Sequence, residues 1–317
     1  MHSNHATRVA VVCGGSSAEA EVSRVSARGV ADALRTAGFQ VDVVELDPHI
    51  DKAISAASPD VVFPVLHGPP GEDGTFQGFL ETLSIPYVGS GVRASACAMD
   101  KALAKHLFRD AGLPVARDTL VHRGQGSKEG ARQVTIALGL NVVVKPTRQG
   151  SALGVRFPST REELEAALDE AFRFDERVLV ENRVTGREIT VALLERDELE
   201  ALPVIEVSTP PGSWYDFTHR YTAGLSEHVI PAPLPAPQYR RTQEIAKLAH
   251  IALGCRDLSR ADFVVPADGE PVLLEVNTLP GMTPTSLYPD AARAAGLSFE
   301  QLVETLARRA LSRKAEK

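Results

Sequence analysis

The chain has 317 residues, with 34 basic and 41 acidic side chains and a net charge of −7. This length suffices for two or three compact lobes, and the acidic balance argues against nucleic acid or an anionic membrane as a main partner. No apolar run approaches the roughly 20 residues of a membrane span, and the polar N-terminus lacks a signal segment, so we expect no membrane association.

The three cysteines, Cys13, Cys97 and Cys255, are far apart in the sequence. No Cys-x-x-Cys pair or Cys/His cluster accompanies them, which argues against a zinc site and against a disulfide framework. The pattern favours reduced, buried thiols in a cytoplasmic protein.

The chain opens with a pattern typical of a parallel α/β lobe. Residues 8–13 predict a strand, a Gly14-Gly15 turn follows, and a helical pattern then continues to Gly38. Residues 41–46 and 61–66 predict two further strands. Because ligands of such sheets bind beyond the carboxyl ends of the strands, loops 14–19 and 67–74 are expected to face a ligand.

Two residues in these loops have alternative interpretations. Ser16 to Glu19 forms a Ser-x-x-Glu capping box, so spacing alone favours a helix-capping role for Glu19 over contact with a substrate ammonium group. His67 follows an apolar strand and precedes a glycine-rich loop. A structural hydrogen bond and a ligand contact remain equally open for this histidine.

Residues 92–111 predict a helix on which Lys101 and Lys105 form a solvated face. Lys145 ends the apolar strand in segment 141–146, where its charge requires an anionic partner. The Gly/Ser-containing loop 147–155 follows, and its backbone N–H groups could close over phosphates. A flexible turn without a ligand is the alternative, and Lys145 at the root of the loop favours phosphate binding.

The next segments alternate between helices and strands. Residues 160–172 predict an amphipathic helix, residues 177–181 a strand that ends in Glu181, and residues 189–194 and 201–207 further strands. The proline-rich segment 210–237 is expected to be an ordered lid because it carries several aromatic residues. Helices are predicted over 238–253 and 298–311.

A hairpin near the C-terminus carries oxygen donors inside apolar strands. Asp262 lies in strand 261–265, and Glu275 and Asn277 share one face of strand 273–277. Antiparallel pairing would bring the three side chains together as a site for Mg²⁺. Ordinary polar residues on a half-exposed hairpin are the alternative, but unpaired carboxylates in apolar runs cost on the order of several kcal/mol, which favours a cation.

Six motifs together resemble the D-alanine–D-alanine ligases of the ATP-grasp superfamily. They are GGSSAEAEVS, LHGPPGEDG, YVGSGVRASACAMDK, VVVKPTRQGS, SRADF and LLEVNTLPGMTPTSL, and the resemblance spans roughly residues 8–310. It implies an α/β (α+β) chain with an N-terminal α/β substrate-binding lobe over 1–100. A central lobe over 101–190 and a C-terminal lobe over 191–317, with the metal site and lid, would clasp ATP between antiparallel sheets.

The resemblance also implies roles for individual residues. The implied ATP contacts are Lys101, Lys145, Ser151, Glu181 (adenine), Glu188 (ribose) and Asn277. The implied ligands of two Mg²⁺ ions, for which Mn²⁺ could substitute, are Asp262, Glu275 and Asn277. The implied substrate contacts are Glu19, His67, Arg260, Gly281, Ser286 and Leu287. The implied catalytic group is Glu19, Ser151, Tyr221, Arg260 and Gly281, so Glu19 is expected to serve as both cap and ligand.

The implied reaction makes D-alanyl-D-alanine from two D-alanines through an acyl phosphate, for peptidoglycan synthesis by a cytoplasmic homodimer. The sequence departs from the family's commonest pattern at Pro69, Gln149, Ala152 and Arg220. All four lie on loops, so we expect them to affect the reaction rate and the closure of these loops more than the type of reaction. One rival is a ligase with D-serine or D-lactate as acceptor, and Tyr221 speaks against D-lactate. A non-catalytic nucleotide-binding regulator is the other rival, although the lysines and metal ligands are present.

Overall fold

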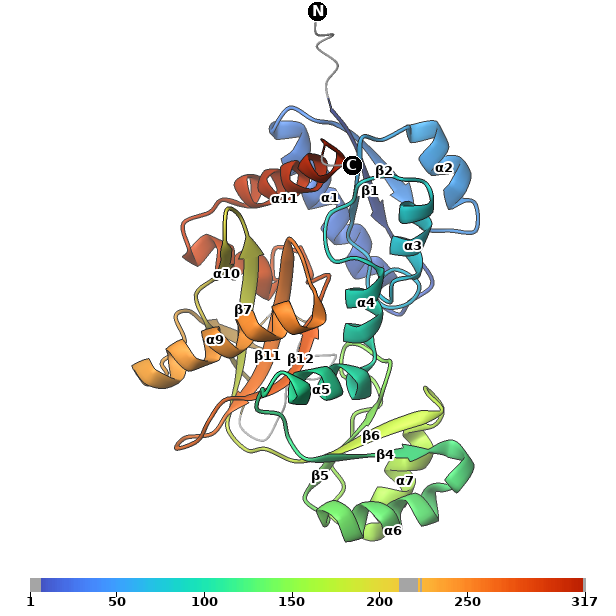
Figure 1. The fold of residues 1–317 in the computed structure, drawn as a ribbon, viewed down its shortest axis with the longest axis vertical. Helices are drawn as coiled ribbons and strands as arrows, with labels where there is room; N and C mark the ends of the chain where they lie inside the picture. Colours follow the sequence, from blue (N-terminus) through green and yellow to red (C-terminus); the bar gives the residue numbers. More distant parts are fainter. Residues whose placement is uncertain (1–6, 211–221, 223, 316–317) are drawn as a thin grey trace, which may run out of the picture.

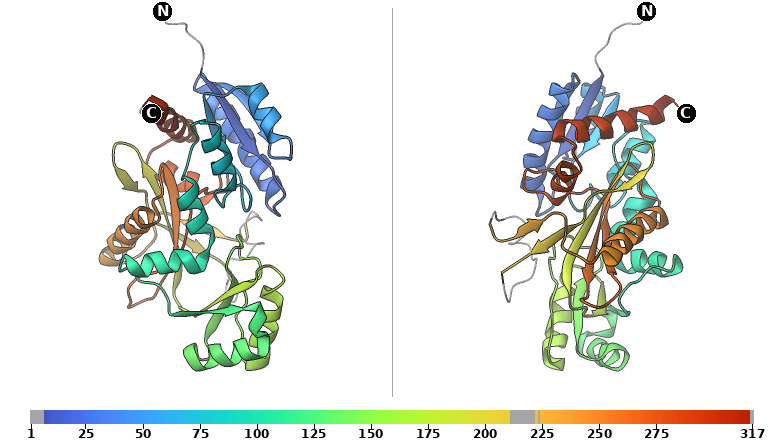
Figure 2. Two further views of the ribbon diagram at one scale, coloured as in Figure 1. Left: turned by 45° about the vertical axis from the view of Figure 1, so that its right-hand side comes forward. Right: turned by 90° about the vertical axis from the view of Figure 1, so that its left-hand side faces the viewer.

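The computed structural model describes residues 7–210, 222 and 224–315 of the chain. In its described part, three sheets follow one another along the long axis of the molecule (Figure 1). The N-terminal parallel sheet and the small sheet lie at opposite ends, and the large sheet lies between them, as the two turned views also show (Figure 2). The predicted α/β (α+β) class is confirmed.

The N-terminal sheet has the strand order β2-β1-β3, and all of its pairs are parallel. Its central strand is apolar on both faces because helices cover both sides. The elements of this part are β1 (Arg8–Cys13), α1 (Ala20–Thr36), β2 (Gln40–Glu45), α2 (Ile50–Ala57), β3 (Val61–Pro64) and α3 (Thr75–Thr82).

The small sheet has the order β4-β6-β5 and is antiparallel. Two helices pack on it around a core of valine, leucine and alanine side chains. The elements here are β4 (Asp118–His122), the 3₁₀ turn η1 (Arg123–Gln125), α6 (Ser127–Leu138), β5 (Val142–Pro146), α7 (Arg161–Ala171) and β6 (Arg177–Asn182). The loop after β5 returns to it, because Val144 forms an antiparallel bridge with Arg156.

The large sheet has the order β10-β9-β7-β11-β12, with β8 beside β7, and its pairs are antiparallel. Helices cover both of its faces. The remaining elements are α4 (Val92–Met99), α5 (Lys101–Asp110), β7 (Arg187–Glu195), β8 (Leu199–Ala201), β9 (Ile205–Ser208), β10 (Glu227–Val229), α9 (Ala236–Leu253), β11 (Leu258–Val265), β12 (Val272–Asn277), α10 (Leu287–Ala294) and α11 (Phe299–Ala315).

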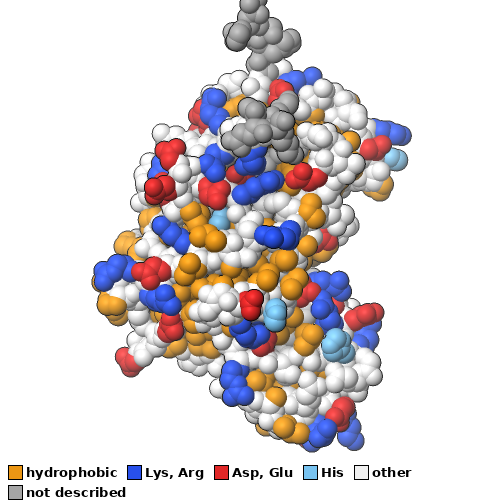
Figure 3. All heavy atoms as spheres, in the orientation of Figure 1, with side chains coloured by type: hydrophobic (Ala, Val, Ile, Leu, Met, Phe, Trp, Pro, Cys, Tyr) orange, Lys and Arg blue, Asp and Glu red, His pale blue; other side chains and the backbone are white. Residues whose placement is uncertain are grey.

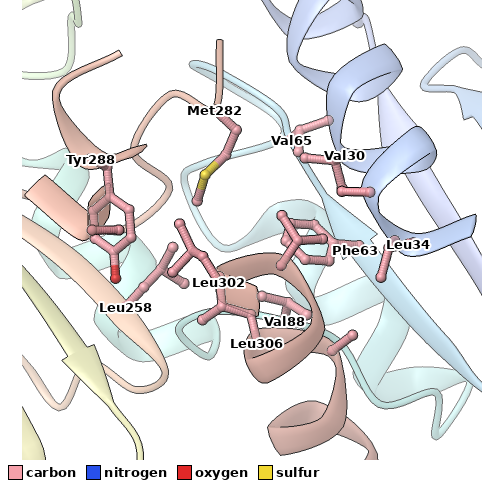
Figure 4. Close-up of a cluster of buried hydrophobic side chains, with 14 of the residues drawn as sticks. Val30, Leu34, Phe63, Val65, Val88, Leu258, Met282, Tyr288, Leu302 and Leu306 are labelled. Atoms are coloured by element: carbon pink, nitrogen blue, oxygen red, sulfur yellow. The ribbon is translucent and has the colours of Figure 1, made fainter. Parts of the chain in front are cut away.

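The C-terminal helix α11 joins the N-terminal sheet to the large sheet. Figure 4 shows Leu302 and Leu306 of α11 at the centre of one buried apolar cluster. Leu34 and Phe63 of the N-terminal part lie on one side of them, and Tyr288 of α10 lies on the other. Residues from both ends of the sequence therefore share one core, and the lobe boundaries near residues 100 and 190 stay a prediction.

Several predicted boundaries differ from the observed ones. The predicted helix 92–111 is two helices, because Asp100 has extended backbone angles and caps α5 by accepting from the Leu103 N–H at 3.1 Å. The predicted strand 201–207 is wrong as one element, since β8 ends at Ala201 and β9 begins at Ile205. All three cysteines are free, as predicted, with Cys13 and Cys255 buried.

The molecular surface mixes charges of both signs. On the face in Figure 3, Lys and Arg side chains are interspersed with Asp and Glu side chains, and apolar side chains gather across its middle. Within the described residues, no helix combines the length and the apolar character needed to cross a membrane.

A buried carboxylate fastens α11 to the rest of the molecule. Asp257 is fully buried and accepts hydrogen bonds from the Gly89 N–H at 2.8 Å and from both terminal nitrogens of Arg313 at 2.5 and 2.8 Å. Arg313 also donates to the Tyr87 carbonyl at 2.6 Å. This arrangement ties the end of α11 to both neighbouring parts.

We predict that Arg313→Met lowers the free energy of unfolding by about 2 kcal/mol, because the buried Asp257 loses its charged donor. Urea denaturation measures this change. Arg293→Met is the matched control, since Arg293 pairs with Asp290 while its side chain is 69% exposed, and its loss should cost less than about 0.5 kcal/mol. Equal losses in the two variants would contradict a special role for the buried pair.

Candidate active site

Two cavities meet where the three sheets approach each other. The larger, of about 300 Å³, lies between the small and large sheets, and the smaller, of about 110 Å³, lies beside the carboxyl ends of the N-terminal strands. Both are lined by the same five residues at their junction: Lys101, Gln149, Gly150, Ser151 and Glu275. Ligands in the two cavities would therefore meet at one shared wall.

The smaller cavity brings together the residues predicted to bind substrate. Its lining includes all six of them: Glu19, His67, Arg260, Gly281, Ser286 and Leu287. They come from the N-cap of α1, the loop after β3, strand β11, the loop after β12 and the start of α10. The expectation that loops 14–19 and 67–74 share a ligand site agrees with this arrangement, because Glu72 also lines the cavity.

The capping interpretation of Glu19 is wrong. Glu19 occupies the N-cap position of α1, but no side-chain cap is formed there. Its carboxylate instead accepts a hydrogen bond from the hydroxyl of Ser151, which lies 132 residues further along the chain. Sequence spacing favoured the cap because the tertiary partner is invisible in the local pattern. The contact ties the loop after β5 to the N-terminal part.

His67 is buried between charged groups of opposite sign. Burial lowers the pKa of His67, the nearby Arg260 lowers it further, and Glu19 opposes both effects. Its Nε2 has no hydrogen-bond partner among the described residues. A neutral imidazole at the wall of the cavity, with one nitrogen unoccupied, suits hydrogen bonding to a ligand.

Strand β11 supplies a guanidinium that is held rigidly. Arg260 is 8% exposed and binds Asp262 through two hydrogen bonds of 2.8 and 2.7 Å. The hydroxyl of Thr190 on β7 donates to the same carboxylate at 2.6 Å. Arg260 lines the smaller cavity, whereas Asp262 lines neither cavity. The donor is thus preorganised toward the position of a bound anion.

The predicted oxygen-donor hairpin is present. Strands β11 and β12 pair so that Asp262 faces Glu275 and Arg260 faces Asn277, with a register shift after Asp262. The Oε2 of Glu275 lies 3.2 Å from the ammonium of Lys101, and the Oδ1 of Asn277 accepts from the Leu279 N–H at 2.8 Å. Asn277 and Glu275 both line the smaller cavity.

These side chains fit a hard divalent cation that is partly held by a ligand. Their donors are carboxylate and amide oxygens, and Lys101 places a positive group against Glu275. Among the described residues, no group of three or more His, Cys, Asp or Glu side chains could hold a metal ion. A bound Mg²⁺ would therefore complete its coordination with water or phosphate oxygens.

The larger cavity contains the remaining predicted nucleotide contacts. Lys145 of β5, Glu181 of β6 and Glu188 of β7 line it from the two sheets. Lys145 contacts the carboxylate of Glu181, which satisfies the expectation that its charge has an anionic partner. Ser151 and Lys101 lie at the junction, and Lys101 donates to the Gln149 carbonyl at 2.7 Å.

Three further residues of the site escaped the sequence analysis. Lys105 was expected on a solvated face, but it is buried and contacts Glu181. Thr190 and Glu72 carry no local signal beyond a β-strand and a glycine-rich loop. Only the rotation of α5 about its own axis, which decides which of its faces packs against the rest of the molecule, could have shown that Lys105 points inward. Tyr221, a predicted catalytic residue, lies outside the described residues.

The chain is similar to known ligases over nearly its full length. The family model "D-ala D-ala ligase C-terminus" matches residues 107–308, and "D-ala D-ala ligase N-terminus" matches residues 48–90. A D-alanine–D-alanine ligase of Halalkalibacterium halodurans is 44% identical over 300 residues, which cover 94% of this chain and 97% of that protein.

Solved structures give the same result. The D-alanine–D-alanine ligase of Bacillus anthracis superposes with a TM-score of 0.87 at 31% identity, covering 98% of this chain and 99% of that one. A structure of the B. anthracis enzyme complexed with ATP superposes with a TM-score of 0.83 at 30% identity, with the same coverages of 98% and 99%.

One prediction concerns Glu72, whose Oε2 accepts from the Gly68 N–H at 3.0 Å. Burial raises the pKa of Glu72 from 4.5 to about 7. The folded chain therefore binds an extra proton between these values, and its stability falls as the pH rises through that window. In nucleotide-free protein treated with a chelator, Glu72→Gln should remove this fall and gain about 3 kcal/mol relative to wild type between pH 4 and pH 8.

Urea denaturation at several pH values measures the effect. Glu162→Gln, at an exposed position of α7, is the control and should follow the wild-type curve. If wild type and Glu72→Gln show parallel pH dependence, the proton is not held at Glu72.

Proposed function

Because the chain belongs to the D-alanine–D-alanine ligase family, we propose that it joins two molecules of D-alanine and converts one ATP to ADP and phosphate. The product, D-alanyl-D-alanine, is a precursor of peptidoglycan. The observation that carries this proposal is the shared wall of the two cavities, where Lys101, Ser151 and Glu275 adjoin both. A nucleotide on one side and an amino acid on the other would meet there.

ATP occupies the larger cavity, between the two antiparallel sheets of the ATP-grasp fold. Glu181 accepts from the adenine amine and Glu188 from the ribose. Lys145 and Lys101 bind the phosphates, and the loop around Ser151 closes over them. The γ-phosphoryl group then passes to the carboxylate of the first D-alanine, and the two lysines stabilise the charge on the transferring oxygens.

Asp262, Glu275 and Asn277 would hold two Mg²⁺ ions, which supply charge neutralisation to the phosphates when bound. For Asp262 this requires one oxygen to give up a hydrogen bond from Arg260, because Oδ1 now accepts from Arg260 and Thr190 and Oδ2 accepts from Arg260. Lys101 likewise exchanges its contact with Glu275 for one with phosphate. The donor set and the cationic group already present at Glu275 support this assignment.

The first D-alanine lies in the smaller cavity. Glu19, held by Ser151, receives its ammonium group, and the neutral His67 hydrogen-bonds nearby. The amine of the second D-alanine attacks the acyl phosphate, and the new C–N bond forms as an oxyanion develops on the carbonyl oxygen. Arg260 and the Gly281 N–H stabilise this oxyanion until the C–O bond to phosphate breaks.

Ser286 and the Leu287 backbone bind the carboxylate of the second D-alanine at the start of α10. Room there is limited, because a Cβ added to Gly281 would lie 2.8 Å from the Ser286 hydroxyl. Tyr221 completes the catalytic group with Ser151 and Glu19. We also propose that the enzyme works in the cytoplasm, where ATP is supplied, and that it forms a homodimer.

Product identification tests the proposed reaction directly. Incubation with D-alanine, ATP and Mg²⁺ should give D-alanyl-D-alanine with one ADP and one phosphate per dipeptide, measured by mass spectrometry and coupled ADP assay. Parallel reactions add D-serine or D-lactate as the second substrate across pH. Preferred use of either acceptor at neutral pH, or ADP release that D-alanine does not stimulate, would contradict the proposal.

Glu275→Gln should lower kcat at least about a hundredfold, because the variant loses a carboxylate oxygen that would hold the Mg²⁺ needed to neutralise the phosphates. The fold should persist, since the side chain is partly exposed and its partner Lys101 keeps the Gln149 carbonyl as an acceptor. Steady-state kinetics and thermal denaturation measure the two effects. Near-normal turnover in this variant would remove Glu275 from the metal site.

A further inference from the structure

Two lysines share one buried carboxylate between the small sheet and α5. The Nζ of Lys105 lies 2.5 Å from one oxygen of Glu181, and Lys145 contacts the other oxygen. Glu181 and Lys145 line the larger cavity, but Lys105 does not. Lys105 is 1% exposed and belongs to the middle of α5, whereas Lys145 lies at the cavity surface.

The charges in this cluster do not balance within it. Two ammonium groups face one carboxylate, so the cluster carries one excess positive charge. Burial raises the pKa of Glu181, but Lys145 and Lys105 together outweigh burial and hold that pKa at about 2. The carboxylate is therefore ionised, and an anion arriving in the cavity would find Lys145 already paired.

We propose that Lys105 is a positioning residue for the nucleotide: it remains paired with Glu181 and so frees Lys145 to leave that carboxylate for the phosphates of ATP. The same contact keeps Glu181 charged and aimed at the exocyclic amine of adenine. The inference rests on the proposed function, in which Glu181 faces the base and Lys145 faces the phosphates.

The positions of the two lysines support these separate roles, in which Lys105 stays with Glu181 and Lys145 moves to the phosphates. Lys105 is enclosed, because α5 packs against α9 and β12, and its helix neighbours Ala104 and Phe108 are buried. Its side chain does not line the cavity. If Lys145 were the sole partner of Glu181, its movement to the phosphates would leave a buried unpaired carboxylate, which is a strongly unfavourable state. Lys105 removes this penalty.

The first test is Lys105→Met, which keeps most of the length of the side chain and removes its charge. We expect the KM for ATP to rise about tenfold while kcat at saturation changes less than about threefold, as for a lost charged hydrogen bond in ground-state binding. The ratio of kcat/KM for ATP to that for inosine triphosphate should also fall about tenfold, because inosine lacks the exocyclic amine that Glu181 accepts from. The matched control is His106→Met at the adjacent exposed position of α5, which should leave both quantities unchanged.

A second variant distinguishes positioning from a purely structural role. Lys105→Met combined with Glu181→Gln neutralises both partners, so stability should return toward wild type even if the single variant folds poorly. The double variant is compared with Glu181→Gln alone, because Glu181→Gln by itself changes adenine binding. If Lys105 positions the nucleotide through Glu181, adding Lys105→Met to Glu181→Gln raises the KM for ATP less than about twofold further. A further rise of about tenfold would show that Lys105 acts independently of Glu181, and this outcome overturns the inference.

Unchanged KM and unchanged base preference in a folded Lys105→Met protein would also overturn it. Wild-type protein that makes no dipeptide would instead refute the proposed function. The two failures are therefore distinguishable in one set of assays.

Discussion

Buried charge that must be paired is the constraint on which this structure depends. Glu181, Asp257 and the Arg260–Asp262 pair are all largely withdrawn from solvent. An unpaired charge at any of these places would cost more than a typical surface contact contributes. Glu181 and Asp257 pair with groups on elements that are distant in sequence, whereas Arg260 and Asp262 both belong to β11. Satisfying the first two charges therefore also fixes how the three sheets meet.

The same constraint prepares the site for ligands. Lys101 and Lys145 now contact Glu275 and Glu181, and both pairs lie at cavity walls. These contacts hold the lysines in place, and an anionic ligand can replace the carboxylate as their partner. Arg260 is different, because two hydrogen bonds join it to Asp262, and one of them can still hold the guanidinium toward the cavity when the other Asp262 oxygen turns to a cation. Pairs that exchange completely and a pair that is partly retained thus coexist in one site.

The apolar cores complete the assembly. The cluster around Leu302 and Leu306 unites α11 with the N-terminal sheet, whereas the core of the small sheet contains only its own elements. The contact between Ser151 and Glu19 is a polar link from the loop after β5 to the N-terminal part. The larger cavity therefore lies between a firmly joined pair of sheets and a more independent small one.

Local patterns were sufficient where a residue's environment follows from its immediate neighbours. The apolar run ending at Lys145 and the hairpin that pairs Asp262 with Glu275 have the predicted form, because strand period and turn composition are local properties. The order and spacing of the six sequence motifs were also sufficient to identify the family. The break between α4 and α5 at Asp100 was missed because the helical periodicity of the apolar residues on both sides is a stronger signal than one capping aspartate.

The sequence by itself determined the oxygen-donor hairpin, the family, and the helices and strands apart from the break at Asp100 and the segment 201–207, since each depends on short-range spacing or on motifs in register. Tertiary structure alone decided that Glu19 meets Ser151 instead of capping α1 and that Lys105 is buried against Glu181. In both cases the partner lies more than 70 residues away. The direction of such a side chain depends on how whole elements pack, which no local pattern contains.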